Sequence, residues 1–201
     1  MSLSSRMVIV LTTVGLISGG FLAGVAQLTK ERIALNIQKE IEEAIVKVVP
    51  GTTQNSKLYE EEDFTIYGGQ DESGGTTGYA VQATGIGFQD KITLMFGIND
   101  SLERIIGLTI IDQKETPGLG AKITDWNAFL QFWEERDATG QLTLRKPATS
   151  SLGDLSPSEI NTITGATISS QKVLGIVNLS LDKLKRFISQ RKTACEEQGV
   201  H

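Results

Sequence analysis

A run of small and hydroxyl residues lies just before the last predicted helix. Residues 161–170 read NTITGATISS, and Gly165 and Ala166 stand between Thr164 and Thr167. The N-terminus of a helix presents unpaired backbone N–H groups and a partial positive charge, which together bind anions, and small residues let a large group approach the backbone. The pattern is therefore compatible with a phosphate-binding site. Taken alone, it is explained more simply by an ordinary turn in which Thr164 or Thr167 is the N-cap of the helix.

A second segment with chemical groups, residues 115–121, directly follows an apolar predicted strand. It reads ETPGLGA. The Pro117-Gly118 pair favours a tight turn, so we expect the loop to cross the end of that strand. The carboxylate of Glu115, the hydroxyl of Thr116 and exposed backbone could line a pocket there, although the segment by itself indicates only a well-defined loop.

The composition argues against several other kinds of site. Among 201 residues there is one cysteine, Cys195, and one histidine, His201, so the sequence offers no intrachain disulfide framework, Cys/His zinc site or Cys–His dyad. Lys and Arg total 19 against 24 Asp and Glu, a net charge of −5, whereas nucleic-acid binders usually carry a basic face. We therefore expect no catalytic residues, no metal site and no nucleic-acid partner.

The first 29 residues are predicted to form a transmembrane anchor. No charged residue occurs from Met7 to Thr29, and a helix over residues 7–28 would be about 33 Å long, enough for a ~30 Å hydrocarbon core. A signal peptide is the alternative, because residues 23–26 (AGVA) resemble a cleavage site. Apolar segments of signal peptides are only ~7–15 residues long, which favours the retained anchor. More cations follow the span than precede it, which points to a cytoplasmic domain, but such counts carry little weight before a long domain.

Residues 30–50 are predicted to form an amphipathic connecting helix. Apolar residues recur there at every fourth position, at Ile33, Ile37, Ile41, Ile45 and Val49. Pro50-Gly51 ends the pattern. We expect this helix to continue the anchor outwards and to dock its apolar stripe on the domain formed by residues 51–190.

The pattern within residues 51–190 predicts an α+β domain. The segment 52–75 is polar and glycine-rich, and we expect a solvated loop or edge there. Alternating or continuous apolar residues predict strands at 79–83, 92–98, 104–111 and 141–146. Helical spacing predicts helices at about 125–136, with Trp126 and Trp133 in the core, and at about 168–190, before a polar tail at 191–201. The order of these elements lacks a repeating βαβ unit and favours an antiparallel or mixed sheet packed by helices.

The two chemical segments together resemble those of a known family. The chain is similar to the RnfG-type flavin-carrying subunit of Rnf electron-transport complexes, and to the related NqrC subunit of sodium-pumping NADH:quinone oxidoreductase. The family pattern Asp-x-x-(Ser/Thr)-Gly-Ala-Thr is matched by TGAT at residues 164–167, with Asn161 in place of the Asp. The run ETPGLG at residues 115–120 matches the second motif of the family, and Gln113 stands where several relatives have His.

The resemblance implies a covalent FMN cofactor. In the family, the threonine after Gly-Ala carries FMN through a phosphoester bond, so Thr167 is the expected attachment site, and a separate flavin transferase makes the bond. The resemblance also implies an FMN-binding domain in which the cofactor is bound by Thr164, Gly165, Ala166, Thr167, Ser169 and Ser170 and by Glu115, Thr116, Gly118, Leu119 and Gly120.

The function that the resemblance implies is an electron relay. The FMN would pass electrons between redox centres of a membrane complex that couples ferredoxin-to-NAD⁺ electron transfer to translocation of Na⁺ or H⁺. The expected partners are membrane lipid and the other subunits of the Rnf complex, including a second flavin-carrying membrane subunit. The expected location is the inner cell membrane, crossed once, with the C-terminal domain on the extracytoplasmic side.

Three other interpretations remain open at this point. An NqrC-like subunit would share the same chemistry, but such subunits are generally longer. A non-redox extracytoplasmic binding or sensor domain predicts further membrane spans or a cytoplasmic output module. A pilin-like subunit needs a glutamate early in the apolar stretch, whereas residues 7–29 contain no acidic residue.

Overall fold

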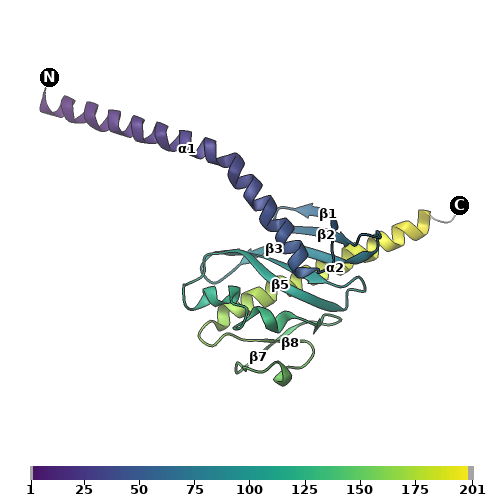
Figure 1. The fold of residues 1–201 in the computed structure, drawn as a ribbon. Coiled ribbons are helices and arrows are strands. Elements are labelled where there is room, and N and C mark those ends of the chain that lie inside the picture. Colours follow the sequence, from purple (N-terminus) through teal and green to yellow (C-terminus); the bar gives the residue numbers. More distant parts are fainter. Residues whose placement is uncertain (1, 199–201) are drawn as a thin grey trace. The chain divides into compact units, whose positions relative to one another are not determined.

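The structure is a computed structural model that describes residues 2–198, without the side chains at positions 31, 34, 192 and 194–198. The side chain of Cys195 and the whole of His201 therefore lie outside the described part. The chain divides into two compact units, residues 1–42 and the residues from Glu43 onwards. Figure 1 shows the order of the elements, from a long N-terminal helix through a series of strands to a C-terminal helix.

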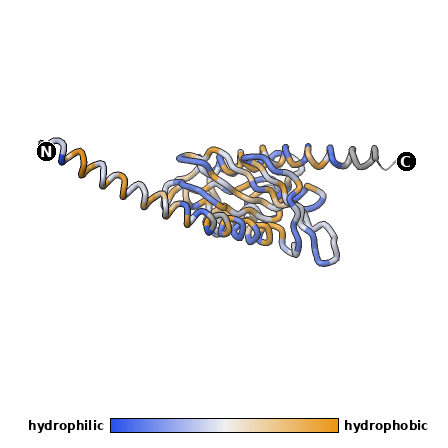
Figure 2. Tube along the Cα trace, turned by 90° about the horizontal axis from the view of Figure 1, so that it is seen from above, coloured by the Kyte–Doolittle hydropathy of each residue, from blue (hydrophilic) through white to orange (hydrophobic). Residues whose placement is uncertain are grey.

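α1 (Leu3–Val48) is one continuous helix of 46 residues, so the predicted anchor and the predicted connecting helix form a single element. At ~1.5 Å per residue it is about 70 Å long, more than twice the thickness of a ~30 Å membrane core. Among the described residues it is the one helix long and apolar enough to cross a membrane, and the side chains of its most apolar stretch are exposed. Figure 2 shows the hydrophobic, orange residues that recur along its N-terminal part. These features are consistent with a single-pass membrane anchor.

Only the last turns of α1 are buried in the domain. Ile45 and Val48 are fully covered, as is Val49 just after the helix, but Ile33 and Ile37 are exposed. The burial of Ile45 and Val49 agrees with the predicted docking at the end of the stripe, whereas Ile33 and Ile37 belong to the other compact unit.

The domain is built on a six-stranded antiparallel sheet in which neighbouring strands follow one another in the sequence. They are β1 (Gln54–Glu61), β2 (Phe64–Gln70), β3 (Thr76–Ile86), β4 (Lys91–Ile98), β5 (Arg104–Gln113) and β6 (Arg136–Asp137). The strands predicted at 79–83, 92–98 and 104–111 are confirmed as parts of β3, β4 and β5. An antiparallel sheet with helices packed on it confirms the α+β class.

The segment 52–75, predicted as a solvated loop or edge, contains β1 and β2, so the edge is confirmed for β1 and the loop is not. β1 is the edge strand, and most of its side chains are exposed, which accounts for its polar sequence. β2 is buried along most of its length, and a Cβ at Gly68 would lie 3.1 Å from the side chain of Leu58. A Cβ at Gly69 would lie 2.6 Å from the Thr52 hydroxyl. The glycines here reflect close packing against a strand rather than a flexible loop.

The helix predicted at residues 125–136 is also wrong. The segment forms turns and one short 3₁₀ helix, η2 (Leu130–Trp133), before the chain enters β6. Trp133 is fully buried against Phe129, with ring centroids 5.7 Å apart, but Trp126 is exposed rather than part of the core. Glu135 adopts a left-handed backbone conformation with φ 56°, which no helix continues through. The aromatic spacing thus reflects the burial of Phe129 and Trp133, but the segment does not form an α-helix.

The remaining elements are η1 (Gly120–Thr124), β7 (Thr143–Arg145), η3 (Leu152–Asp154), β8 (Glu159–Asn161) and α2 (Thr167–Gln198). β7 confirms the strand predicted at 141–146, and it pairs in parallel with β8, which the sequence pattern did not reveal. α2 confirms the predicted last helix but continues to Gln198, through most of the segment expected as a polar tail. Residues 199–201 lie outside the described part.

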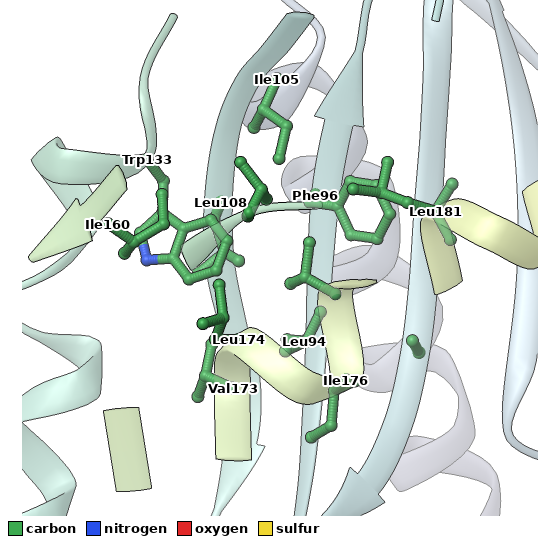
Figure 3. Close-up of a cluster of buried hydrophobic side chains, with 14 of the residues drawn as sticks. Leu94, Phe96, Ile105, Leu108, Trp133, Ile160, Val173, Leu174, Ile176 and Leu181 are labelled. Atoms are coloured by element: carbon green, nitrogen blue, oxygen red, sulfur yellow. The ribbon is translucent and has the colours of Figure 1, made fainter. Parts of the chain in front are cut away.

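The sheet is covered on both faces. α2 packs so closely on β3 that a Cβ at Gly85 would lie 2.5 Å from Cγ1 of Ile176. Side chains alternate across a strand, so Gly97 of β4 faces the other way, and there the backbone of Val48 occupies the space of a Cβ. Figure 3 shows the core between the sheet and α2, with Leu94, Phe96, Ile105, Leu108, Trp133, Ile160, Val173, Leu174, Ile176 and Leu181.

Candidate functional site

The first predicted segment forms a tight turn into α2. Gly165 has φ +83°, a left-handed conformation that glycine adopts without strain, and the N–H of Ala166 donates to Ile163 O at 3.0 Å. Thr167 is the first residue of α2, and Ser170 N–H donates to Ala166 O at 3.1 Å. As at any helix N-terminus, the amides of residues 167–169 have no carbonyl partner in a preceding turn.

This turn is held by Ser170 and not by a threonine N-cap. The fully buried Ser170 hydroxyl accepts from Ile163 N–H at 3.2 Å and donates to Ala166 O at 3.1 Å. Among the hydrogen bonds of the described residues, none includes the hydroxyl of Thr164 or Thr167. The amides of the first turn of α2 are thus not used by either threonine, which favours an anion-binding site over the capped turn.

The second predicted segment follows β5 and turns directly into η1. The N–H groups of Leu119 and Ala121 both donate to Thr116 O at 3.1 Å, and Gly118 has φ +76°. This is the tight turn that Pro117-Gly118 predicts. The turn exposes Leu119 but buries Glu115, so the segment contributes both an apolar side chain and a buried carboxylate.

A third segment, the turn between β3 and β4, completes the site, and sequence reasoning missed it. The N–H of Gly87 donates to Asp90 O at 2.8 Å, and Phe88 is exposed. The backbone N–H of Lys91 and the Lys114 ammonium, 3.4 Å away, hold the pKa of the Asp90 carboxyl below its usual range. A signal was present in the sequence, because Phe88 is a large apolar residue in an otherwise polar turn.

The three segments enclose a cavity of about 300 Å³. It is lined by Phe88, Glu115, Thr116, Leu119, Gly120, Gly165, Ala166, Thr167, Ile168 and Ser169. The structure therefore brings together most of the predicted site residues from both segments. Of the others, Gly118 and Thr164 shape the turns without lining the cavity, and Ser170 lies beneath it as part of the buried turn.

Glu115 is held by three donors at the back of the cavity. Its Oε1 accepts from the N–H of Phe88 at 2.7 Å and from the N–H of Gln89 at 3.2 Å, and its Oε2 accepts from the Ser169 hydroxyl at 2.7 Å. The residue is 4% exposed. A buried carboxylate requires such donors, so this side chain connects the ends of β3, β5 and the start of α2.

Asn161, which departs from the family pattern, does not line the cavity. It lies on β8 and is 3% exposed. Its Oδ1 accepts from Thr149 N–H at 2.9 Å, and its Nδ2 donates to Thr149 O at 2.6 Å. An aspartate could accept the first of these hydrogen bonds but, when ionised, could not donate the second. Asn161 therefore holds the chain at Thr149 against β8.

The chemistry available in the cavity is that of binding. Its polar groups are hydroxyls, backbone amides and one buried carboxylate, and its rim carries the apolar side chains of Phe88, Leu119 and Ile168. Over residues 2–198, no cluster of three or more His, Cys, Asp or Glu side chains is placed to hold a metal ion. The arrangement suits a ligand with an anionic group and a flat apolar ring.

Comparison with known families gives a match over the part of the chain that contains the cavity. Residues 87–182 match the model of the FMN-binding domain. This stretch is similar to FMN-binding domains. It begins at Gly87, in the turn that supplies Phe88, and includes all three segments around the cavity. The site that the two predicted segments form thus lies within the stretch that matches the model.

The chain is similar to the G subunit of an ion-translocating oxidoreductase complex from Methanosarcina acetivorans, with 26% identity over 185 residues, or 89% of this chain and 93% of that protein. It is 38% identical over 125 residues to the G subunit of the Na⁺-translocating ferredoxin:NAD⁺ oxidoreductase complex of Acetobacterium woodii, covering 60% of this chain and 55% of that protein. The structure of the C subunit of the Na⁺-translocating NADH-quinone reductase from Parabacteroides distasonis shares the fold, with a TM-score of 0.56 and 17% identity over 75% of this chain and 92% of that one. The resemblance to G subunits of ion-translocating oxidoreductase complexes is confirmed.

Proposed function

We propose that the chain carries FMN covalently on Thr167 and relays electrons within an Rnf-type ferredoxin:NAD⁺ oxidoreductase complex. The observation that carries this proposal is the meeting of the two predicted segments around one cavity, with Thr167 at the first residue of α2. The FMN-binding domain and the similarity to G subunits of ion-translocating complexes support the same function.

The residues around the cavity suit FMN. The first-turn amides of α2 and the partial positive charge of the helix would stabilise the phosphodiester anion. Phe88, Leu119 and Ile168 are 59%, 51% and 51% exposed and could pack against the isoalloxazine ring. The cavity of about 300 Å³ lies at the small end of the ~300–1,000 Å³ range of ligand pockets. Part of the flavin would therefore stay outside, and a covalent bond would keep such a partly enclosed cofactor in place.

Attachment through the phosphate has two physical consequences. It prevents loss of the cofactor by dilution outside the cytoplasm, where we place the C-terminal domain. It also leaves the ring unmodified, so the residues around the ring must set its redox properties. Thr167 needs no neighbouring base for this role, because a separate flavin transferase would supply the chemistry of attachment.

The bound FMN would carry out the electron transfer, and the chain would hold the FMN in position. In this proposal α1 anchors the domain in the lipid of the inner membrane, and the domain holds the flavin between other redox subunits, including a second flavin-carrying membrane subunit. The complex would couple the passage of electrons to translocation of Na⁺ or H⁺. The similarity to G subunits supports the Rnf type over an NqrC-like subunit.

Thr167→Ala tests the attachment site directly. We expect it to abolish covalent flavin and to leave the fold intact, because Thr167 is partly exposed and its hydroxyl has no hydrogen-bond partner among the described residues. Thr143→Ala, at an exposed position of β7 that does not line the cavity, is the matched control. Each variant is expressed with an active flavin transferase and examined by denaturing electrophoresis under ultraviolet light. Fluorescence that survives denaturation in Thr167→Ala would place the attachment elsewhere.

A further inference from the structure

We propose that Glu115 is a positioning residue of the flavin site, which holds three walls of the cavity together and places a fixed negative charge beside the cofactor. The inference rests on the proposed function and deepens it. It names a residue that sets how readily the flavin accepts electrons without being its point of attachment.

The carboxylate joins segments that are far apart in the chain. Glu115 follows β5, its Oε1 receives the two N–H groups of Phe88 and Gln89 from the turn after β3, and its Oε2 receives the hydroxyl of Ser169 from the first turn of α2. Its own N–H donates to Oε1 of Gln113 at 2.6 Å, which fixes the backbone just before it. Removal of the carboxylate would leave two backbone amides and a buried hydroxyl without their acceptor.

Glycines at two positions let the walls close on this carboxylate. A Cβ at Gly120 would lie 2.6 Å from Glu115 Oε2 and 2.7 Å from Ser169 Oγ, and a Cβ at Gly87 would collide with Glu115 Oε1. The two glycines thus touch opposite oxygens of the same carboxylate. The packing leaves Glu115 one position, so its hydrogen bonds and its charge are fixed relative to the cavity.

The charge of Glu115 has no cationic partner, because none of the ion pairs among the described residues includes it. Its three hydrogen-bond donors are two backbone N–H groups and a hydroxyl, which carry no net charge. Charges interact several times more strongly in a partly desolvated site than in water. Reduction adds negative charge to the flavin, and a fixed carboxylate in the wall of the cavity opposes that addition. Glu115 is therefore expected to lower the midpoint potential of the bound flavin.

Glu115→Gln tests the charge while it keeps the shape. The glutamine Oε1 can accept from the two amides and its Nε2 can donate to the Ser169 hydroxyl, so the clamp is retained and the charge is lost. The matched control is Glu62→Gln, which removes the same charge at an exposed residue between β1 and β2 that does not line the cavity. Midpoint potentials are measured on the flavin-loaded fraction of the detergent-solubilised full chain.

We expect a more positive midpoint potential in Glu115→Gln and the wild-type potential in Glu62→Gln. A merely structural role of Glu115 would not produce this difference, because the conservative variant keeps the hydrogen bonds. An unchanged potential in Glu115→Gln, or an equal shift in both variants, overturns the assignment of the charge.

Hydrogen exchange tests the clamp on the chain without flavin. Glu115→Ala leaves the amides of Phe88 and Gln89 without an acceptor, so their exchange should be faster by about tenfold or more, whereas Glu115→Gln should stay close to the wild type. Unchanged exchange in Glu115→Ala overturns the positioning role. A wild-type chain that takes up no flavin from an active transferase contradicts the proposed function instead, and the exchange rates then still decide whether Glu115 holds the walls together.

Discussion

Thr167 and Glu115 have different proposed tasks at the scale of single residues, although the resemblance to the family implies that both lie beside a flavin. Thr167 is partly exposed at the start of α2, and its hydroxyl is the proposed attachment atom. Glu115 is buried, and both of its oxygens are occupied by donors from the protein. The sequence motifs contain both residues but do not distinguish their roles. The structure distinguishes them, because the Thr167 hydroxyl is accessible and the Glu115 carboxylate is buried between the walls of the cavity.

Asn161→Asp is predicted to destabilise the domain although it introduces the residue that the family pattern has. The donor on Nδ2, 2.6 Å from Thr149 O, would be replaced by a carboxylate oxygen facing a carbonyl oxygen in a buried position. We expect the free energy of unfolding to fall by about 1–3 kcal/mol, as measured by urea denaturation of the detergent-solubilised chain. Asn127→Asp, at an exposed position, is the control and should change it by less than about 0.5 kcal/mol. Equal effects of the two substitutions would contradict this role of Asn161.

At the scale of elements, α1 combines an exposed apolar segment with a buried end. Its last turns cover the face of the sheet opposite α2, where Gly97 leaves room for the backbone of Val48. The packing on this face therefore depends on residues that directly continue the predicted membrane anchor.

Val48→Ala and Val46→Ala form a matched pair that measures this packing. Val48 is buried, and Val46, two residues earlier in the same helix, is exposed. We expect Val48→Ala to lower the free energy of unfolding by about 2 kcal/mol, through lost burial and a small cavity. Val46→Ala should change it by less than about 0.5 kcal/mol. Equal unfolding midpoints for the two variants in urea would show that the end of α1 does not stabilise the domain.

Elements with a regular pattern could be predicted from the sequence, and elements defined by their neighbours could not. The alternation in β3 and β4 and the helical spacing of α2 reflect burial against the core, and the apolar run of α1 is a continuous exposed segment. β1 is polar because it lies at an edge. The same distinction holds at the site, where both motif segments were found from their residues. The Phe88 turn belongs to the site only because the pairing of β3, β4 and β5 brings it beside Glu115.

At the scale of the whole molecule, the chain joins one candidate membrane span to a domain that matches the model of the FMN-binding domain over residues 87–182. We expect the domain on the extracytoplasmic side, and reporters fused to the C-terminus test this. Alkaline phosphatase, which needs an oxidising compartment to form its disulfides, should be active in the fusion. A green fluorescent protein fused to the C-terminus and exported unfolded to the same side should show no fluorescence. The reverse pattern would place the domain in the cytoplasm, as the count of cations around the span suggests.

The measurement that tests the central claim most directly is the intact mass of the wild-type chain after expression with an active flavin transferase, followed by mapping of the modified peptide. The account predicts a mass gain equal to FMN minus one water, carried by the peptide that contains Thr167. An unmodified mass with a demonstrably active transferase would contradict covalent attachment. A flavin on any residue other than Thr167 would contradict the role assigned to the start of α2.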